Sequence, residues 1–155
     1  MAAQDDLVTR LLGLWDQVPA DDDEARRAFG RLYTDPVRIN GVDVPVERLV
    51  RRARMMSAAL VDRSTEVLSV AGATDRTTVT FRMHGRHVGP MDTPLGPVTG
   101  DGHAVSMQVI DLLTVRDGRI SEIWMVADLL GMLAGTGAVR QATDDVAAAH
   151  SSAEA

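Results

Sequence analysis

The sequence predicts an α+β domain in which three helices are followed by an antiparallel sheet. Up to about residue 60, apolar residues recur at the spacing of amphipathic helices, and beyond Asp62 they alternate with polar residues as in strands. The chain of 155 residues is long enough to bury a core of its own as a single domain. Helices that precede an antiparallel meander are expected to pack together on one face of the sheet.

Three segments before residue 61 have the apolar periodicity of helices. The first covers residues 7–18, and the second covers residues 23–32 behind three consecutive aspartates that can cap its N-terminus. The third begins at Pro45, because proline is favoured in the first turn of a helix. Between the second and third helices, residues 37–40 alternate as a short strand and residues 41–43 are expected to turn.

Four later segments have the period of two that is typical of strands. They cover residues 63–70, 77–87, 104–115 and 119–128. The joins at 72–76 and 116–118 are short enough for hairpins, and the second contains the Asp-Gly pair that tolerates positive φ. The segment between His87 and Ala104 is long and rich in proline and glycine, so we expect an ordered loop at the rim of the sheet.

Composition removes several classes of chemistry. The chain has no cysteine and no lysine, which excludes disulfides, thiolate nucleophiles, Schiff bases and the lysine of a phosphate-binding loop. Acidic residues number 22 against 16 arginines, and the densest basic cluster, at Arg51, Arg52 and Arg54, is expected to be a solvated helix face. We therefore expect no nucleic-acid partner.

Location and boundaries follow from the same composition. The apolar runs are too short to cross a membrane, and the N-terminal residues are acidic where a secretory signal is basic and then apolar. We expect a cytoplasmic protein without a membrane partner. Residues 1–140 are expected to form the domain, and residues 141–155, rich in Ala, Ser and Asp, are expected to be disordered.

Alternation along the predicted strands indicates which side chains share one face of the sheet. If Phe81 and Met83 point inward, then His87 does too. On the next strand, one face carries Val105, Met107, Val109, Asp111 and Leu113. On the last strand, one face carries Ser121, Ile123, Met125 and Ala127, and the opposite face carries Ile120, Glu122, Trp124 and Val126.

Asp111 is a lone carboxylate among valine, methionine and leucine side chains. Burial in such a place raises the pKa of a carboxyl group and makes it useful as a general acid or base near neutral pH. The alternative is a structural carboxylate that is paired with a backbone N–H or with an arginine. His84 and His87 lie on opposite faces of one strand, so we expect no metal site.

Several motifs follow one another between residues 84 and 139. They are GRHVG at 85–89, PLGPVTG at 94–100, VIDLL at 109–113, RDGRI at 116–120, Glu122, Trp124 and DLLGML at 128–133. In order and spacing they resemble the SnoaL-like polyketide cyclase, or ester cyclase, family of the nuclear transport factor 2-like superfamily. The resemblance implies a cone-shaped fold, with three N-terminal helices packed on a strongly curved antiparallel sheet and a pocket inside. That fold hosts cyclases, isomerases, epoxide hydrolases, dehydratases and non-enzymes, so the fold alone does not assign a function.

The resemblance also implies acid–base catalysis of an intramolecular aldol closure. The known cyclases use a histidine at the position that matches Asp111 and an acid at the position that matches Met125, and this chain has replaced both. A pair of Asp111 with His87 or with Asp128 is still able to transfer protons, and both residues match positions where the wider family has the same residue. For His87 the structural alternative is a rim histidine that is hydrogen-bonded to the glycine- and proline-rich loop. For Asp128 it is an aspartate that caps a helix.

Further residues are expected to line the pocket and bind substrate: Trp15, Tyr33, Asp35, Phe81, Met83, Met107, Ile123 and Met125. For Tyr33 and Asp35 the alternative is a turn, and for Trp15 it is the core. We expect a cofactor-independent cyclase, isomerase or lyase that acts on a hydrophobic polyketide-like or aromatic substrate. The alternatives are a limonene-type epoxide hydrolase, whose acid at position 125 is missing here, and a non-catalytic protein that binds a small molecule.

Large apolar residues occupy both faces of the last two predicted strands. A sheet with one solvated face alternates cleanly between apolar and polar residues, so the second face needs a cover. We expect a homodimer that associates through the sheet, because twofold self-association is the commonest assembly of soluble proteins. Each subunit is then expected to hold its own pocket.

Overall fold

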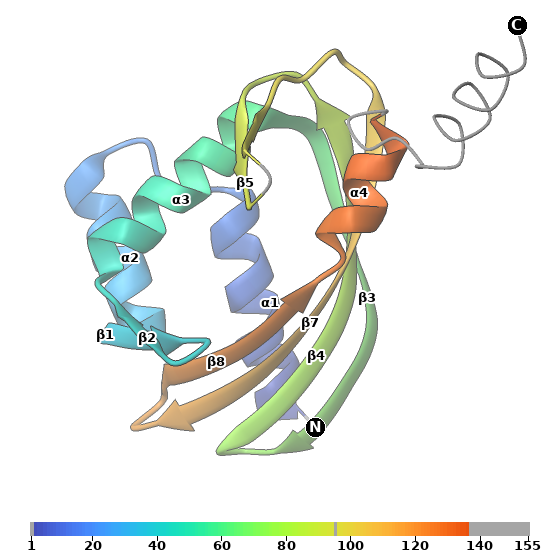
Figure 1. Ribbon diagram of the computed structural model, residues 1–155. Helices are drawn as coiled ribbons and strands as arrows, with labels where there is room; N and C mark the ends of the chain where they lie inside the picture. Colours follow the sequence, from blue (N-terminus) through green and yellow to red (C-terminus); the bar gives the residue numbers. More distant parts are fainter. Residues whose placement is uncertain (1, 95, 137–155) are drawn as a thin grey trace, which may run out of the picture.

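Three helices cover the concave side of a curved sheet in the computed structural model, which describes residues 2–94 and 96–136 (Figure 1). The helices are α1 (Ala2–Asp16), α2 (Asp22–Leu32) and α3 (Val46–Ala59). The predicted α+β class is confirmed, with three helices before the long antiparallel strands. The expected disordered tail, residues 141–155, lies outside the described residues.

The main sheet has six strands in the order β2-β1-β8-β7-β4-β3. The strands are β1 (Tyr33–Ile39), β2 (Val42–Val44), β3 (Leu60–Ala73), β4 (Arg76–His87), β7 (Ala104–Arg116) and β8 (Arg119–Ala127). All neighbours are antiparallel except β1 and β8, which pair in parallel. This pairing joins segments that are far apart in the sequence, so no hairpin restricts its direction and alternation could not predict it.

Local sequence signals explain the helix ends. Asp21 caps α2, because its side chain accepts a hydrogen bond of 2.8 Å from the backbone N–H of Glu24. Pro45 is the N-cap of α3, and the first N–H of that helix, on Val46, donates to the Asp35 side chain at 3.1 Å. Asp35 therefore holds the start of α3 against the start of the sheet.

The turn expected at residues 41–43 lies one residue earlier. Asn40 and Gly41 have φ angles of 48° and 82°, the values of a two-residue hairpin turn, and Val42 already pairs with Ile39. Asn40 also binds the backbone of Met125 on β8, accepting from its N–H at 2.7 Å and donating to its carbonyl at 3.1 Å. The Asn-Gly pair was the stronger turn signal, and the segment after it is strand.

The hairpin between β7 and β8 turns at Asp117 and Gly118, as predicted, with φ angles of 50° and 72°. Beyond it the pairing register shifts, because Thr114 pairs with Glu122 while Val115 pairs with Ile120. This irregularity reverses the alternation on β8, so that Ile120 is fully buried in the core. The prediction that Ile120 lies on the outer face is therefore wrong.

The segment between β4 and β7 contains a small separate hairpin, β5 (Met91–Thr93) and β6 (Gly96–Val98). The chain between β6 and β7 packs on the end of β4. The N–H of His87 donates to the carbonyl of His103, and the N–H of Gly102 donates to the carbonyl of His87. A Cβ on Gly100 would lie 2.6 Å from backbone atoms of His87 and Val88, so only glycine fits. The expected ordered loop is confirmed and is held by backbone contacts.

A fourth helix, α4 (Leu129–Gly135), follows β8 and was not among the three predicted helices. Asp128 is its N-cap, and its side chain accepts from the N–H of Gly131 at 2.8 Å. Two buried residues of α4, Met132 and Leu133, pack in a second cluster, whose buried members are Leu60, Met83, Val105, Met132 and Leu133. None of the helices in the described part of the chain is long and apolar enough to cross a membrane.

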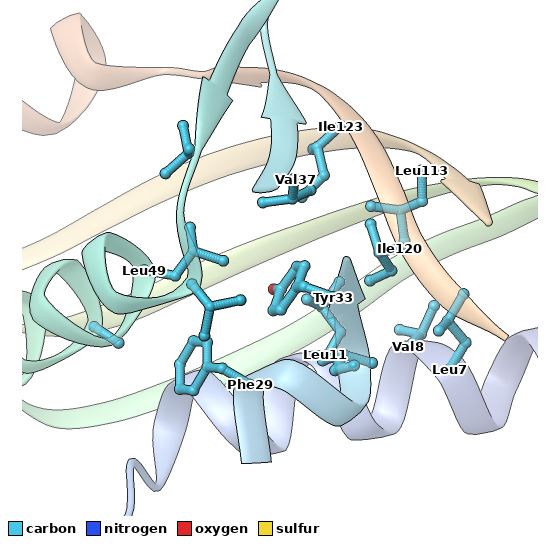
Figure 2. Close-up of a cluster of buried hydrophobic side chains, with 14 of the residues drawn as sticks. Leu7, Val8, Leu11, Phe29, Tyr33, Val37, Leu49, Leu113, Ile120 and Ile123 are labelled. Atoms are coloured by element: carbon cyan, nitrogen blue, oxygen red, sulfur yellow. The ribbon is translucent and has the colours of Figure 1, made fainter. Parts of the chain in front are cut away.

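The main core lies between the helices and the concave face of the sheet (Figure 2). Phe29 of α2 is fully buried and forms an edge contact with Trp15, at 5.8 Å between ring centroids, and a stacked contact with Tyr33 at 6.0 Å. Leu113 of β7 and Ile120 of β8 enter the same core from the sheet. Packing against Phe29 thus fixes Trp15 and Tyr33, which also line the candidate site.

Candidate functional site

A cavity of about 180 Å³ lies between the helices and the concave face of the sheet. This volume exceeds the roughly 150 Å³ of a cavity that admits benzene. Its wall is mostly apolar and comes from α1, α3 and five strands of the main sheet. The lining residues are Leu11, Leu12, Trp15, Asp16, Tyr33, Ile39, Arg52, Met56, Arg63, Thr65, Phe81, Met83, Met107, Val109, Asp111, Ile123, Met125 and Ala127. An apolar hollow with a few polar groups is the usual form of a small-molecule site.

Asp111 stands on the inward face of β7, as the alternation predicts, between Val79 of β4 and Met125 of β8. It is 7% exposed, and its Oδ1 is buried without a hydrogen-bond partner within the described residues. Burial raises the pKa of this carboxyl group from 3.8 to about 6. Among the described residues, no arginine or backbone N–H pairs with Oδ1, so the fold provides this oxygen with no partner that stabilises its charge.

Tyr33 begins β1 and brings a phenol to the cavity. Its Oη accepts a hydrogen bond of 2.7 Å from Nε1 of Trp15, which lies near the end of α1. Burial raises the pKa of the phenol far above its ordinary value, the Trp15 bond lowers it, and the charge of Asp111 raises it further. Tyr33 is therefore neutral, and its own O–H is available to an oxygen in the cavity.

Two arginines on the wall were missed by the sequence analysis. Arg52 was expected on a solvated face of α3, but it lines the cavity together with Met56, one helical turn further on. Their spacing of four residues places both on one helix face and was the signal that could have shown it. Arg63 also lines the cavity, where alternation counted from the start of β3 predicts an outward side chain.

The structure brings together most of the predicted substrate-binding residues. Trp15, Tyr33, Phe81, Met83, Met107, Ile123 and Met125 all line the cavity with Asp111. Asp35 does not, because it is exposed and its carboxylate binds the first N–H of α3. Asp35 was expected in the pocket because an Asp-Pro pair has the same sequence pattern whether its carboxylate accepts from a helix N–H or faces a pocket.

The two candidate partners of Asp111 are absent from the cavity wall. Asp128 is exposed and caps α4, the structural alternative considered for it. His87 is fully buried, pairs with Leu60 of the second cluster, and has no partner for either ring nitrogen within the described residues. A proton relay from Asp111 to either residue is not supported by this geometry. In the part of the chain that is described, no group of three or more acidic or histidine side chains could hold a metal ion.

Comparison with known proteins gives a family and a fold. A model of the SnoaL-like polyketide cyclase family matches residues 7–135. No curated protein sequence matches the chain. Among solved structures, TsrD from Streptomyces laurentii is similar with a TM-score of 0.72 and 22% identity, over 89% of this chain and 97% of that chain.

Two further structures are described as a polyketide cyclase or as a candidate for one. A SnoaL-like polyketide cyclase from Agrobacterium tumefaciens is similar with a TM-score of 0.62 and 17% identity, over 81% of this chain and 93% of that one. IdmH from Streptomyces antibioticus, a candidate polyketide cyclase, has a TM-score of 0.63 and 20% identity, over 84% of this chain and 98% of its own. At these identities the likeness shows the shared cone-shaped fold and leaves the chemistry to the site itself.

Proposed function

Because the chain belongs to the SnoaL-like polyketide cyclase family, we propose that it is a cofactor-independent acid–base enzyme for a small hydrophobic substrate. The reaction is a cyclisation, isomerisation or elimination on a polyketide-like or aromatic molecule. The observation that supports it is Asp111, a carboxylate with a buried, unpaired oxygen in an apolar cavity. A group of this kind is suited to removing a proton from carbon and returning it elsewhere.

The proposed chemistry begins with the ionised form of Asp111. With a pKa of about 6, the carboxylate is ionised in roughly nine molecules out of ten at pH 7. Its oxygen removes a proton from the carbon beside a substrate carbonyl, and the electron pair moves onto the carbonyl oxygen. The neutral phenol of Tyr33 is the proposed donor to that oxygen, held in place by the bond from Trp15. The protonated Asp111 then returns its proton as the enolate closes a ring or shifts a double bond.

The test measures proton removal without knowledge of the natural substrate. The probe is 1-tetralone in D₂O, and the rate at which deuterium replaces its α-hydrogens is followed by NMR. The wild-type protein should accelerate the exchange with saturation, and Asp111→Asn should return the rate to the background. The matched control is Asp117→Asn, at the exposed tip of the β7–β8 hairpin, where asparagine keeps the same turn. Undiminished exchange by a folded Asp111→Asn protein would exclude Asp111 as the base.

A non-catalytic binding protein is the second candidate, and Met125 favours it. Met125 pairs with Asp111 across β7 and β8 and lines the cavity, but its thioether cannot carry a proton. Native mass spectrometry of the purified protein, followed by extraction of any bound molecule, addresses this candidate. A retained ligand together with no exchange of 1-tetralone supports binding alone. The limonene-type epoxide hydrolase ranks lower, and a panel of epoxides in oxygen-18 water tests it through labelled diols.

Association through the outer face of the sheet is part of the proposal. Ile110, Trp124 and Val126 are 42%, 50% and 70% exposed on the outer faces of β7 and β8, and Ile110 pairs with Val126. Covering these side chains favours a homodimer with a pocket in each subunit. Sedimentation at micromolar concentration should find a dimer for the wild type and a monomer for Trp124→Glu. A wild-type monomer would overturn this assembly. The cytoplasmic location expected from the sequence stays a prediction.

A further inference from the structure

Arg63 carries a buried guanidinium nitrogen that the fold leaves unpaired. Its Nη2 donates to the carbonyl oxygens of Trp15 and Asp16 at 3.2 and 2.9 Å, and to Oγ of Ser57 at 3.0 Å. Its Nη1 is buried and has no hydrogen-bond partner within the described residues. The side chain is thus anchored through one nitrogen, the other has two unused N–H donors, and Arg63 is one of the residues that line the cavity.

An irregularity in β3 turns Arg63 inward. Leu60 pairs with His87 and Thr65 pairs with Met83, both on the inward face of β4, although five residues separate the two β3 positions. Regular alternation over an odd separation would place them on opposite faces. The register shifts between Val61 and Ser64, where Asp62 has a φ of 52°. This bulge returns Arg63 and Thr65 to the inward face, as bulges near functional sites often re-aim a side chain.

A structural role explains the hydrogen bonds of the Arg63 Nη2 but does not explain the buried Nη1. The bonds to Trp15 and Asp16 satisfy carbonyl groups at the end of α1, a common task of arginine near a helix C-terminus. They do not explain Nη1, because a buried charged donor without a partner is costly to the fold. An oxygen atom of a bound molecule would satisfy it, and a guanidinium binds an anionic oxygen more strongly than a neutral one.

Asp111 is not the missing partner of Arg63. Burial alone accounts for the raised pKa of Asp111, whereas a nearby cation would have lowered it. Asp111 and Arg63 are therefore not paired with each other, although both line the cavity. Two other charged residues line it: Asp16, whose backbone carbonyl already accepts from Arg63, and Arg52, which is exposed.

We propose that Arg63 binds an anionic oxygen of the substrate, so that the natural substrate is a hydrophobic acid rather than a neutral molecule. The inference rests on the proposed function, because it places this oxygen in the cavity in which Asp111 acts. Arg63 holds the anionic end through Nη1, the apolar wall holds the carbon skeleton, and the reacting carbon lies toward Asp111. Arg63 is a specificity-determining residue in this arrangement.

The experiment compares two probes of one shape, 2-naphthoate and 2-naphthamide, which differ in charge. Binding to the full chain at pH 6 is followed by NMR through the indole N–H of Trp15, which lines the cavity. The wild type should bind the carboxylate roughly 10- to 100-fold more tightly than the amide, the range expected for a hydrogen bond to a charged partner. Arg63→Met should abolish this preference through a loss of carboxylate affinity, and Arg48→Met, on the exposed face of α3, should keep it.

Two further variants decide the assignment even if Arg63→Met fails to fold. Arg52→Met removes the other lining arginine, so a preference for the carboxylate that survives in it is assigned to Arg63. Loss of the preference in Arg52→Met, or equal binding of the two probes by the wild type, would overturn the proposal. Asp111→Asn should keep the preference, because Arg63 acts through binding. This arm separates the two ideas: exchange of 1-tetralone tests Asp111, and the choice between carboxylate and amide tests Arg63.

Discussion

Replacing Asp111 by asparagine should stabilise the protein in a strongly pH-dependent way. Burial raises the pKa of this carboxyl group from 3.8 to about 6, which corresponds to roughly 3 kcal/mol at about 1.4 kcal/mol per tenfold change in proton affinity. Below pH 3.8 the group is protonated in both the folded and the unfolded chain, so its burial carries no charge penalty. Between pH 3.8 and 6 the unfolded chain loses this proton while the folded protein keeps it, so the free energy of unfolding falls. Above pH 6 both states are ionised, and the penalty for the buried carboxylate is complete.

Asparagine has nearly the same shape and never ionises. Asp111→Asn should therefore match the wild type near pH 4 and exceed its free energy of unfolding by up to roughly 3 kcal/mol at pH 8. Urea denaturation followed by circular dichroism at one-unit steps from pH 4 to 8 measures this difference. Asp117→Asn, at an exposed hairpin tip, should show no such trend. A stability difference that is the same at pH 4 and pH 8 would refute the reasoning.

The same ionisation links stability to activity. If Asp111 is the base, exchange of 1-tetralone should rise with pH around a midpoint near 6, where the stability advantage of the asparagine variant approaches its full size. The residue would then destabilise the fold under the conditions in which it works. Such a trade is common where a catalytic group must be kept out of water.

Two more predictions concern the frame around the site. Phe29→Ala should lower the free energy of unfolding by about 3–5 kcal/mol, because it empties a fully buried position between Trp15 and Tyr33. Urea denaturation measures this loss, and a value below about 1 kcal/mol would contradict the packing. Asp35→Ala should cost about 1 kcal/mol, through the lost bond to the N–H of Val46, and should leave the exchange of 1-tetralone unchanged. A weaker affinity for 2-naphthamide in that variant would return Asp35 to the binding residues.

Alternation along regular strands was enough to find the centre of the site. On β7, the inward positions from Val105 to Leu113 are apolar except Asp111, and the structure buries this carboxylate on that face. The pattern works because each residue of a regular strand reverses the side-chain direction. Periodicity also predicted α2 and α3, since each buries a stripe of its own residues, but it did not predict α4.

The same counting failed wherever a strand is irregular. The shift near Asp62 aims Arg63 into the cavity, and the shift at Thr114 and Val115 brings Ile120 into the core. An inserted residue leaves no mark on composition, so regular counting across it assigns residues on its two sides to the wrong relative faces. The cationic part of the site was missed for this reason.

The sequence by itself determined the α+β class and the inward-facing carboxylate of Asp111, because both follow from periods of residues close in the chain, and the family resemblance implied a pocket. Only the tertiary structure decided which polar groups share that pocket. It placed Asp128 on a helix cap, buried His87 away from the cavity wall, and brought Arg63 to that wall. These outcomes depend on strand register and on contacts between distant segments, which one-dimensional patterns do not contain.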